Sequence, residues 1–157
     1  MCAFARTLLR LLGRVPIALA LLAALVLARP AAAQADSGFT VIVNAVDPVE
    51  VLSRDEISRL FLRKIAMWPY HAAVQPVDQG ETSPVRRAFT RVIHRKDIPA
   101  VKRYWQEATF TGQAVPPIER DGDSAVVAFV GTTRGSIGYV APTAPLGRRV
   151  RTVRIVY

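Results

Sequence analysis

The chain has 157 residues, of which 51% are hydrophobic, and 21 basic and 12 acidic side chains give it a net charge of +9. This length fits one domain. Its one cysteine is Cys2, so a disulfide framework and a cysteine nucleophile are excluded from the rest of the chain.

Residues 1–35 have the pattern of a secretory signal peptide. Three arginines precede the apolar run Val15–Leu27, and small residues offer cleavage sites after Ala33 or Ala35. The run is shorter than the ~20 residues of a membrane-spanning helix, so we expect cleavage and not a retained anchor. We therefore expect a periplasmic protein whose mature part, 36–157, carries 17 basic and 12 acidic residues, a net charge of +5. Export makes nucleic acid an unlikely class of partner, so none is expected.

The first half of the mature part predicts strand, helix and strand. The β-branched run Phe39–Ala45 is typical of a buried strand. Ser53 and Glu56 have the spacing of a capping box and introduce an amphipathic helix, which the turn at Trp68 closes. A second strand is predicted at Val74–Val77, followed by a polar turn over 78–82.

The second half predicts more helices and two final strands. Ser83 and Pro84 are an N-cap and a first helical residue, Asp97 is a second candidate cap, and Asp123 or Ser124 is a third. The expected elements are Pro84–Arg95, Ile98–Ala108, Ala125–Val130, Ser136–Val140 and Val150–Val156. Strands that alternate with helices predict an α/β fold.

The turn that precedes Pro84 has the features of an anion site. A strand that leads through a loop to a helix N-terminus directs free backbone N–H groups and a positive dipole end at one point. Thr82 and Ser83 add hydroxyls, and the amides of Ser83, Val85 and Arg86 are available as donors, since Pro84 has no N–H. The alternative is that Ser83 only caps its own helix.

A second feature is a series of basic residues on the same predicted helix. Arg87, Arg91 and Arg95 are spaced at i, i+4 and i+8, with Arg86 and Lys96 beside them. Such a stripe is either a solvated face or the docking place of an anion or an acidic partner.

The sequence lacks the patterns of metal and hydrolytic sites. His71 and His94 are the only histidines, with no HExxH spacing, and the pair Asp121 and Asp123 lacks the rest of a calcium loop. There is no GxSxG motif. We therefore expect no metal, no cofactor and no enzymatic activity. Tyr139 is a candidate to present its hydroxyl to a cleft, because it stands near the end of a predicted strand.

Several motifs occur together in an order that is typical of one family. They are Phe61-Leu62-Arg63-Lys64 with Trp68, the segment Val77–Phe89, Tyr104-Trp105, Phe110-Thr111-Gly112 and GSIGYV at 135–140. In this order the chain resembles, over Val49–Val140, the phosphate-binding subunit of bacterial phosphate ABC transporters, in the type 2 periplasmic binding protein superfamily. The resemblance implies an α/β fold with a mixed sheet flanked by helices. Because these proteins have two lobes and this chain has room for one, it implies a single lobe.

The loop that holds phosphate in the family reads Arg-Ser-Asp-Gly-Ser-Gly-Thr, and this chain departs from it. Gln79 stands at the arginine, Pro84 at the second glycine and Val85 at the threonine, Ser83 is kept, and Glu81 adds a negative charge. The resemblance therefore implies weak or altered binding of phosphate or a similar oxyanion. Its expected ligand-binding residues are Gln79, Gly80, Thr82, Ser83, Arg86, Arg87 and Tyr139.

The expected partners follow from the same resemblance. A membrane transporter or a sensor protein linked to phosphate uptake or sensing is one, and a second copy, which would restore a two-lobed clamp, is another. The alternative function is a non-catalytic protein–protein interaction module that has lost ligand binding, and Glu81 and the missing lobe point to it.

Overall fold

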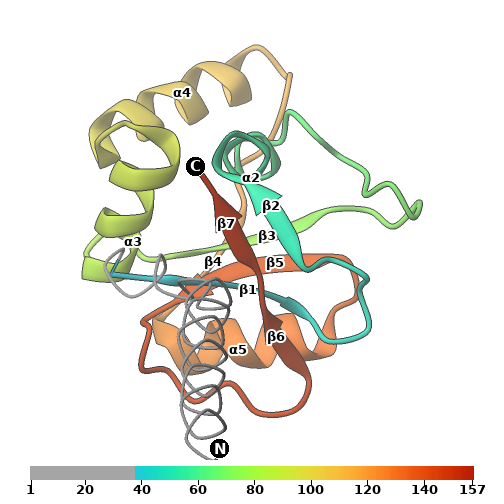
Figure 1. Ribbon diagram of the computed structural model, residues 1–157. Coiled ribbons are helices and arrows are strands. Elements are labelled where there is room, and N and C mark those ends of the chain that lie inside the picture. Colours follow the sequence, from blue (N-terminus) through green and yellow to red (C-terminus); the bar gives the residue numbers. More distant parts are fainter. Residues whose placement is uncertain (1–37) are drawn as a thin grey trace, which may run out of the picture. The chain divides into compact units, whose positions relative to one another are not determined.

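The computed structural model describes residues 38–157 (Figure 1). The expected signal peptide and its cleavage positions lie outside the described residues. The described part is a mixed α/β domain with a five-stranded sheet, a separate two-stranded sheet and helices on both faces of the larger sheet. This confirms the expected fold class. Within 38–157, no helix is both long and apolar enough to span a bilayer.

The larger sheet has the strand order β4-β3-β5-β1-β6. Strand β1 lies antiparallel between β5 and β6, and Thr40 is opposite Val140. Strand β3 is parallel to both of its neighbours, β4 and β5. The bounds are β1 Thr40–Asn44, β3 Gln75–Gln79, β4 Ile118–Arg120, β5 Ser136–Val140 and β6 Val150–Thr152.

Helix α5 (Gly122–Thr132) covers one face of this sheet. Its Val126 and Val130 pack against Ile42 and Val77 in a small aliphatic core. Gly138 on β5 lets the helix come close, because a Cβ there would lie 2.8 Å from methyl groups of Val126 and Val77.

The other face is covered by α2 (Arg54–Phe61) and α3 (Pro84–Phe89), which continues into the π-helical segment η1 (Thr90–His94). The core between them is aromatic: the rings of Phe89 and Tyr139 stack with their centroids 3.9 Å apart. Helix α4 (Ile98–Phe110) lies farther from the sheet and packs Val101 and Trp105 against Leu62.

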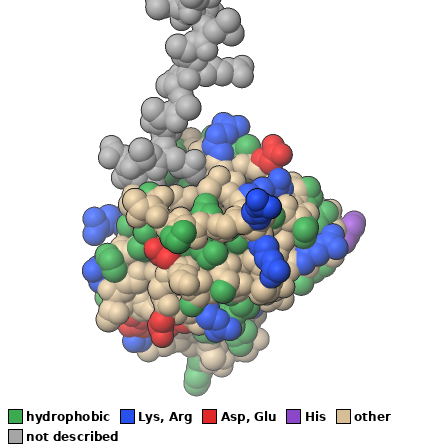
Figure 2. All heavy atoms as spheres, turned by 90° about the horizontal axis from the view of Figure 1, so that it is seen from below, with side chains coloured by type: hydrophobic (Ala, Val, Ile, Leu, Met, Phe, Trp, Pro, Cys, Tyr) green, Lys and Arg blue, Asp and Glu red, His purple; other side chains and the backbone are tan. Residues whose placement is uncertain are grey.

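The smaller sheet pairs β2 (Val51–Ser53) with β7 (Arg154–Val156) in parallel. Helix α2 follows β2 directly, and the capping box of Ser53 and Glu56 is present in both directions, as predicted. On the face of the molecule shown in Figure 2, basic side chains are more prominent than acidic ones, in keeping with the positive net charge.

The structure corrects several element boundaries. The second predicted strand continues through Asp78 and Gln79, because their buried side chains are hydrogen-bonded within the fold and need no solvent-exposed turn. Helix α5 begins at Gly122, so neither Asp123 nor Ser124 is its cap. The predicted strand Val150–Val156 is two strands in different sheets, and β2 and β4 were not predicted.

Candidate functional site

The turn between β3 and α3 forms the N-terminus that the sequence predicts. Ser83 has extended backbone angles, its hydroxyl oxygen accepts from the amide of Arg86 at 3.2 Å, and Pro84 opens the helix. The amide of Ser83 donates to the carbonyl of Gly80 at 2.9 Å, which closes the turn. Ser83 therefore does cap its own helix, as the simpler interpretation held.

A second helix N-terminus lies opposite this turn. The loop after β4 leads through Asp121 into α5, and Gly122 adopts a positive φ of 77° that suits glycine. A Cβ on Gly80 would lie only 3.3 Å from a carboxylate oxygen of Asp121, so the two turns approach closely. The starts of α3 and α5 thus border one shallow hollow of about 420 Å³, which we call the loop hollow. Its lining residues are Gln79, Gly80, Thr82, Ser83, Pro84, Val85, Asp121, Gly122 and Asp123.

The side chain of Gln79 crosses the base of the loop hollow. Its oxygen accepts from the Ser83 hydroxyl at 2.7 Å, and its nitrogen donates to Asp123 at 2.8 Å and to the Tyr139 carbonyl at 3.1 Å. Asp123 also accepts from the amide of Ala141 at 3.1 Å. A neutral amide therefore links a hydroxyl on one helix start to a carboxylate on the other.

Arg86 does not face the loop hollow. Its side chain is buried, and its guanidinium pairs with Asp78 at 3.2 Å and also bonds Glu119 and the carbonyl of Gln79. It lines a different hollow of about 520 Å³ beside Trp105. Two carboxylates neutralise the charge of Arg86 and occupy its N–H donors, so Arg86 is poorly suited to bind an anion.

Tyr139 is also directed into the protein. Its ring is fully buried and its hydroxyl donates to Asp78. Burial raises the pKa of the Tyr139 hydroxyl, and burial also raises the pKa of Asp78 against the opposing charge of Arg86. Asp78 and Tyr139 hold β3 and β5 together, and neither lines the loop hollow.

A loop residue, Glu81, and a residue of α3, Arg87, point away as well. The carboxylate of Glu81 pairs with Lys102 on α4 at 3.0 Å, and it lines the hollow of Arg86. Arg87 donates to the carbonyl of Thr82 at 2.7 Å and lies in a third hollow. Of the seven expected ligand residues, Gln79, Gly80, Thr82 and Ser83 are brought together, and Arg86, Arg87 and Tyr139 are not.

The sequence analysis missed the acidic side of the loop hollow. The sequence offers Asp123 only as a candidate helix cap, and the pair Asp121 and Asp123 only as an incomplete calcium loop. The three exposed residues of β4 give no strand pattern that would place the pair at the edge of the sheet. The glycine between the two aspartates was the available signal, since a positive φ is typical of a tight turn into a helix.

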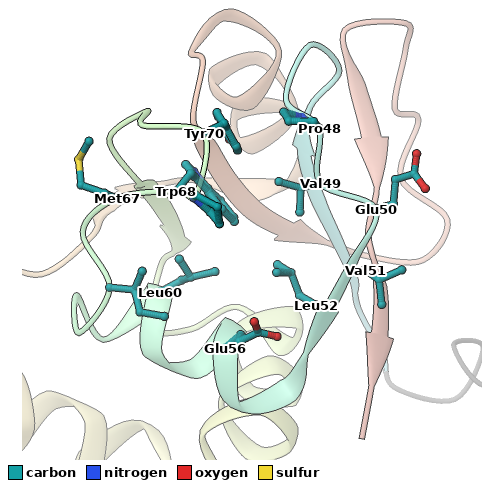
Figure 3. Close-up of a pocket in the computed structure, with 12 residues that line it drawn as sticks. Pro48, Val49, Glu50, Val51, Leu52, Glu56, Leu60, Met67, Trp68 and Tyr70 are labelled. Carbon is teal, nitrogen blue, oxygen red and sulfur yellow. The ribbon is translucent and has the colours of Figure 1, made fainter.

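A larger hollow, of about 540 Å³, is mainly apolar (Figure 3). It lies between β2, α2 and the segment that carries Trp68 and Tyr70, whose rings stack at 5.9 Å. The indole of Trp68 donates to the carbonyl of Gly135 at 2.8 Å, so it is fixed by the fold. Glu50 and Glu56 are the charged residues of its lining, and Glu56 is engaged in the capping box. Among residues 38–157 no cluster of side chains is suited to a metal ion.

No family model and no curated protein matches this sequence. Solved structures do match its fold. A protein from Clostridium perfringens, assigned as a phosphate ABC transporter substrate-binding protein and solved with bound phosphate, aligns with a TM-score of 0.59 at 20% identity. The alignment covers 75% of this chain and 44% of that one.

Two other structures agree with this likeness. An ABC-type phosphate transport receptor from Vibrio cholerae has a TM-score of 0.54 at 14% identity, with 75% of this chain and 46% of that chain covered. A phosphate binding protein from Stenotrophomonas maltophilia has a TM-score of 0.54 at 21% identity, with 75% and 39% covered. The chain thus spans less than half the length of the proteins it matches, and it has the fold of a part of them.

Proposed function

We propose that this protein is an exported, non-catalytic, single-lobe solute-binding protein that takes a protonated oxyanion in the loop hollow. Its fold is shared with part of proteins that are named for phosphate binding, and one of these was solved with phosphate. The observation that carries the proposal is the convergence of two helix starts, at Ser83 and Gly122, on one hollow. The start of α5 has no side-chain cap and contributes free amides, whereas at the start of α3 the amides of Ser83 and Arg86 are already hydrogen-bonded and that of Val85 remains. Both starts contribute a positive dipole end.

The lining favours phosphate over sulfate. Asp121 and Asp123 repel a fully ionised anion, but a carboxylate can accept a hydrogen bond from an oxyanion that still carries an O–H group. Phosphate keeps a proton near neutral pH, and sulfate does not. Binding is expected to be weak, because no guanidinium group lines the hollow and the hydroxyl of Ser83 already donates its hydrogen bond to Gln79.

The same proposal includes the partners. With phosphate bound, a lobe of this kind would dock on a membrane transporter in phosphate uptake or on a sensor protein in phosphate sensing. A second copy facing the loop hollow would bury the anion from both sides. The periplasm is the proposed location, since residues 1–35 have a signal-peptide pattern.

Calorimetric titration of the purified protein with phosphate and with sulfate tests this function. We expect saturable heat with phosphate and a weaker response with sulfate. Ser83→Ala should weaken phosphate binding by about tenfold, the effect of losing one hydrogen bond to a charged group. Thr152→Ala, which removes an exposed hydroxyl on β6 at the opposite edge of the sheet from β4, is the matched control and should change nothing.

Asp123→Asn tests the selectivity. This change removes the charge but keeps an oxygen that can accept from Gln79 and Ala141. We expect the preference for phosphate over sulfate to become smaller but not to vanish, because Asp121 remains in the lining. If the wild-type protein gives no heat with millimolar phosphate, or if sulfate binds it as well as phosphate, the proposal is wrong.

A further inference from the structure

A third hollow, of about 520 Å³, lies between the end of η1 and the start of α4. We call it the basic groove, because Arg87, Arg91, Arg95 and Lys96 line it. All four side chains are exposed. The remaining lining residues are Asp97, Ile98 and Pro99.

The π-helical segment keeps the three arginines in line. An α-helix completes a turn in 3.6 residues, so side chains four apart drift around its axis in one direction. A π turn holds more residues, and the same spacing drifts in the opposite direction. Arg87 to Arg91 crosses from α3 into η1, and Arg91 to Arg95 follows η1, so the two drifts largely cancel. Arg95 then takes a left-handed φ of 53°, which ends the helix beside α4.

These positive charges have few partners of opposite sign. Among the described residues, none of the four basic side chains of the groove forms an ion pair with a carboxylate. Asp97 lies in the groove, but it caps α4 by accepting from the amide of Ala100 at 2.8 Å. The charge of Arg95 helps to lower the pKa of Asp55, after the larger effect of Arg54, with which Asp55 pairs at 2.9 Å.

The shape of the groove restricts the class of ligand. From Arg87 to Arg95 the stripe is about 12 Å long, at the rise of a helix, which is more than one phosphate group can contact. The lining contains no aromatic side chain, and its non-polar residues are Ile98 and Pro99 alone. Single-stranded nucleic acids stack on aromatic rings, and peptides insert aromatic or large aliphatic anchors into deep pockets. The groove therefore suits an extended anion with closely spaced charges and no aromatic part.

We propose that the basic groove binds linear inorganic polyphosphate. A guanidinium holds phosphate oxygens through two parallel N–H donors, and three guanidinium groups in line match a chain of phosphates. This site is separate from the loop hollow, and it does not depend on orthophosphate binding there.

The test is a titration of the purified protein with polyphosphates of increasing length, at two salt concentrations. We expect affinity to rise from pyrophosphate to longer chains and to level off once the stripe is covered, and to fall as salt is added. Arg91→Glu should lower the affinity for a long chain by about tenfold or more, as expected for the loss of one charge-assisted contact. Arg148→Glu makes the same change of charge on an exposed turn outside the groove and should alter it less than twofold.

Two further variants separate the possible causes. Arg95→Asn removes a charge at a residue whose left-handed backbone suits asparagine, so it should fold and still bind more weakly. Ser83→Ala should leave polyphosphate binding unchanged, which separates this site from the loop hollow. Equal losses in Arg91→Glu and Arg148→Glu would show general charge attraction and overturn the proposal. So would affinity that does not depend on chain length, or tighter binding of a poly-glutamate peptide, an oligonucleotide or anionic vesicles.

Discussion

The hydroxyl of Ser83 donates to the side-chain oxygen of Gln79 at 2.7 Å while its oxygen accepts from the amide of Arg86. One side chain thus caps the start of α3 and also holds the Gln79 side chain at the base of the loop hollow. An anion that binds there has to replace the Gln79 contact without disturbing the cap. Stability and binding can therefore be separated at this residue.

Ser83→Ala should lower the free energy of unfolding by about 1 kcal/mol, the usual value of an N-cap. Ser83→Asp keeps an acceptor for the amide of Arg86 but loses the donor to Gln79, so it should be more stable than Ser83→Ala, less stable than wild type, and unable to bind phosphate because of charge repulsion. Urea denaturation and phosphate titration of both variants check this. Equal stability of wild type and Ser83→Ala would contradict the role of the cap.

If the loop hollow binds an anion as proposed, the charge of Asp121 opposes that binding and the charge of Glu81 does not. Asp121 lines the loop hollow, whereas the carboxylate of Glu81 is paired with Lys102. We expect Asp121→Asn to strengthen phosphate binding and Glu81→Gln to change it less than about twofold, since exposed pairs contribute little. Calorimetry on the two variants decides between the residues, and a larger gain from Glu81→Gln would refute this assignment.

Arg86→Met should destabilise the fold strongly, by about 3–5 kcal/mol near neutral pH, because it leaves the buried charge of Asp78 without a partner. Burial already raises the pKa of Asp78, and a carboxyl with a raised pKa contributes stability below its unfolded pKa of about 3.9 and loses it as pH rises through the folded pKa. Without Arg86 that pKa rises further. The defect should therefore grow from pH 4 to pH 7, as measured by urea denaturation.

The double variant Asp78→Asn with Arg86→Met is the control for this effect. It removes both charges, so its stability should recover in part and no longer fall with rising pH in this range. A defect of Arg86→Met that is the same at pH 4 and pH 7 would show that lost packing, and not the unpaired carboxylate, is the cause.

His94 should give the opposite pH dependence. Burial, followed by the charges of Arg86 and Lys96, lowers its pKa to about 4, and its Nδ1 lies 2.9 Å from the Ser58 hydroxyl. A histidine with a lowered pKa contributes stability above its unfolded pKa near 6.5, which is lost as pH falls through the folded pKa. The loss between pH 7 and pH 4 should be about 3 kcal/mol. His94→Gln, which does not titrate, should reduce this slope in chemical denaturation.

Arg95→Gly should stabilise the protein by up to about 1 kcal/mol, because glycine adopts a left-handed φ without the steric cost of a Cβ. Arg91→Gly, inside η1, should instead destabilise it by about 1 kcal/mol. Thermal unfolding of the pair compares a helix end with a helix interior. A lower melting temperature for Arg95→Gly would mean that the arginine side chain stabilises the fold in a way that outweighs its backbone strain.

Local signals predicted much of this fold. The capping box at Ser53, the N-cap at Ser83 and the β-branched strand β1 all depend on neighbouring residues, and each was found where expected. Strands β2 and β4 were missed because three-residue strands have no readable period and are defined by their pairing partners. The split at Val153 is of the same kind, since only the positions of β1 and β2 determine it.

The candidate site was less predictable, because the direction in which a charged side chain points is determined by tertiary structure. The sequence places Arg86 and Arg87 on one helix turn. In the structure Arg86 is buried against Asp78, whereas Arg87 is exposed to solvent. Likewise, Asp123 meets Gln79 only through the pairing of β3 with β4 and the start of α5.

The position of β1 has a consequence for how the domain folds. Its two partners in the sheet are β5 and β6: Thr40 pairs with Val140, and Ile42 pairs with Thr152. These partners are about a hundred residues apart in the sequence. These pairings have a high contact order, and a large loop must close before they stabilise anything. The centre of the sheet is therefore expected to assemble late and slowly. Until then the apolar β1 segment is exposed, so the unfolded chain has a long interval in which a chaperone can bind it.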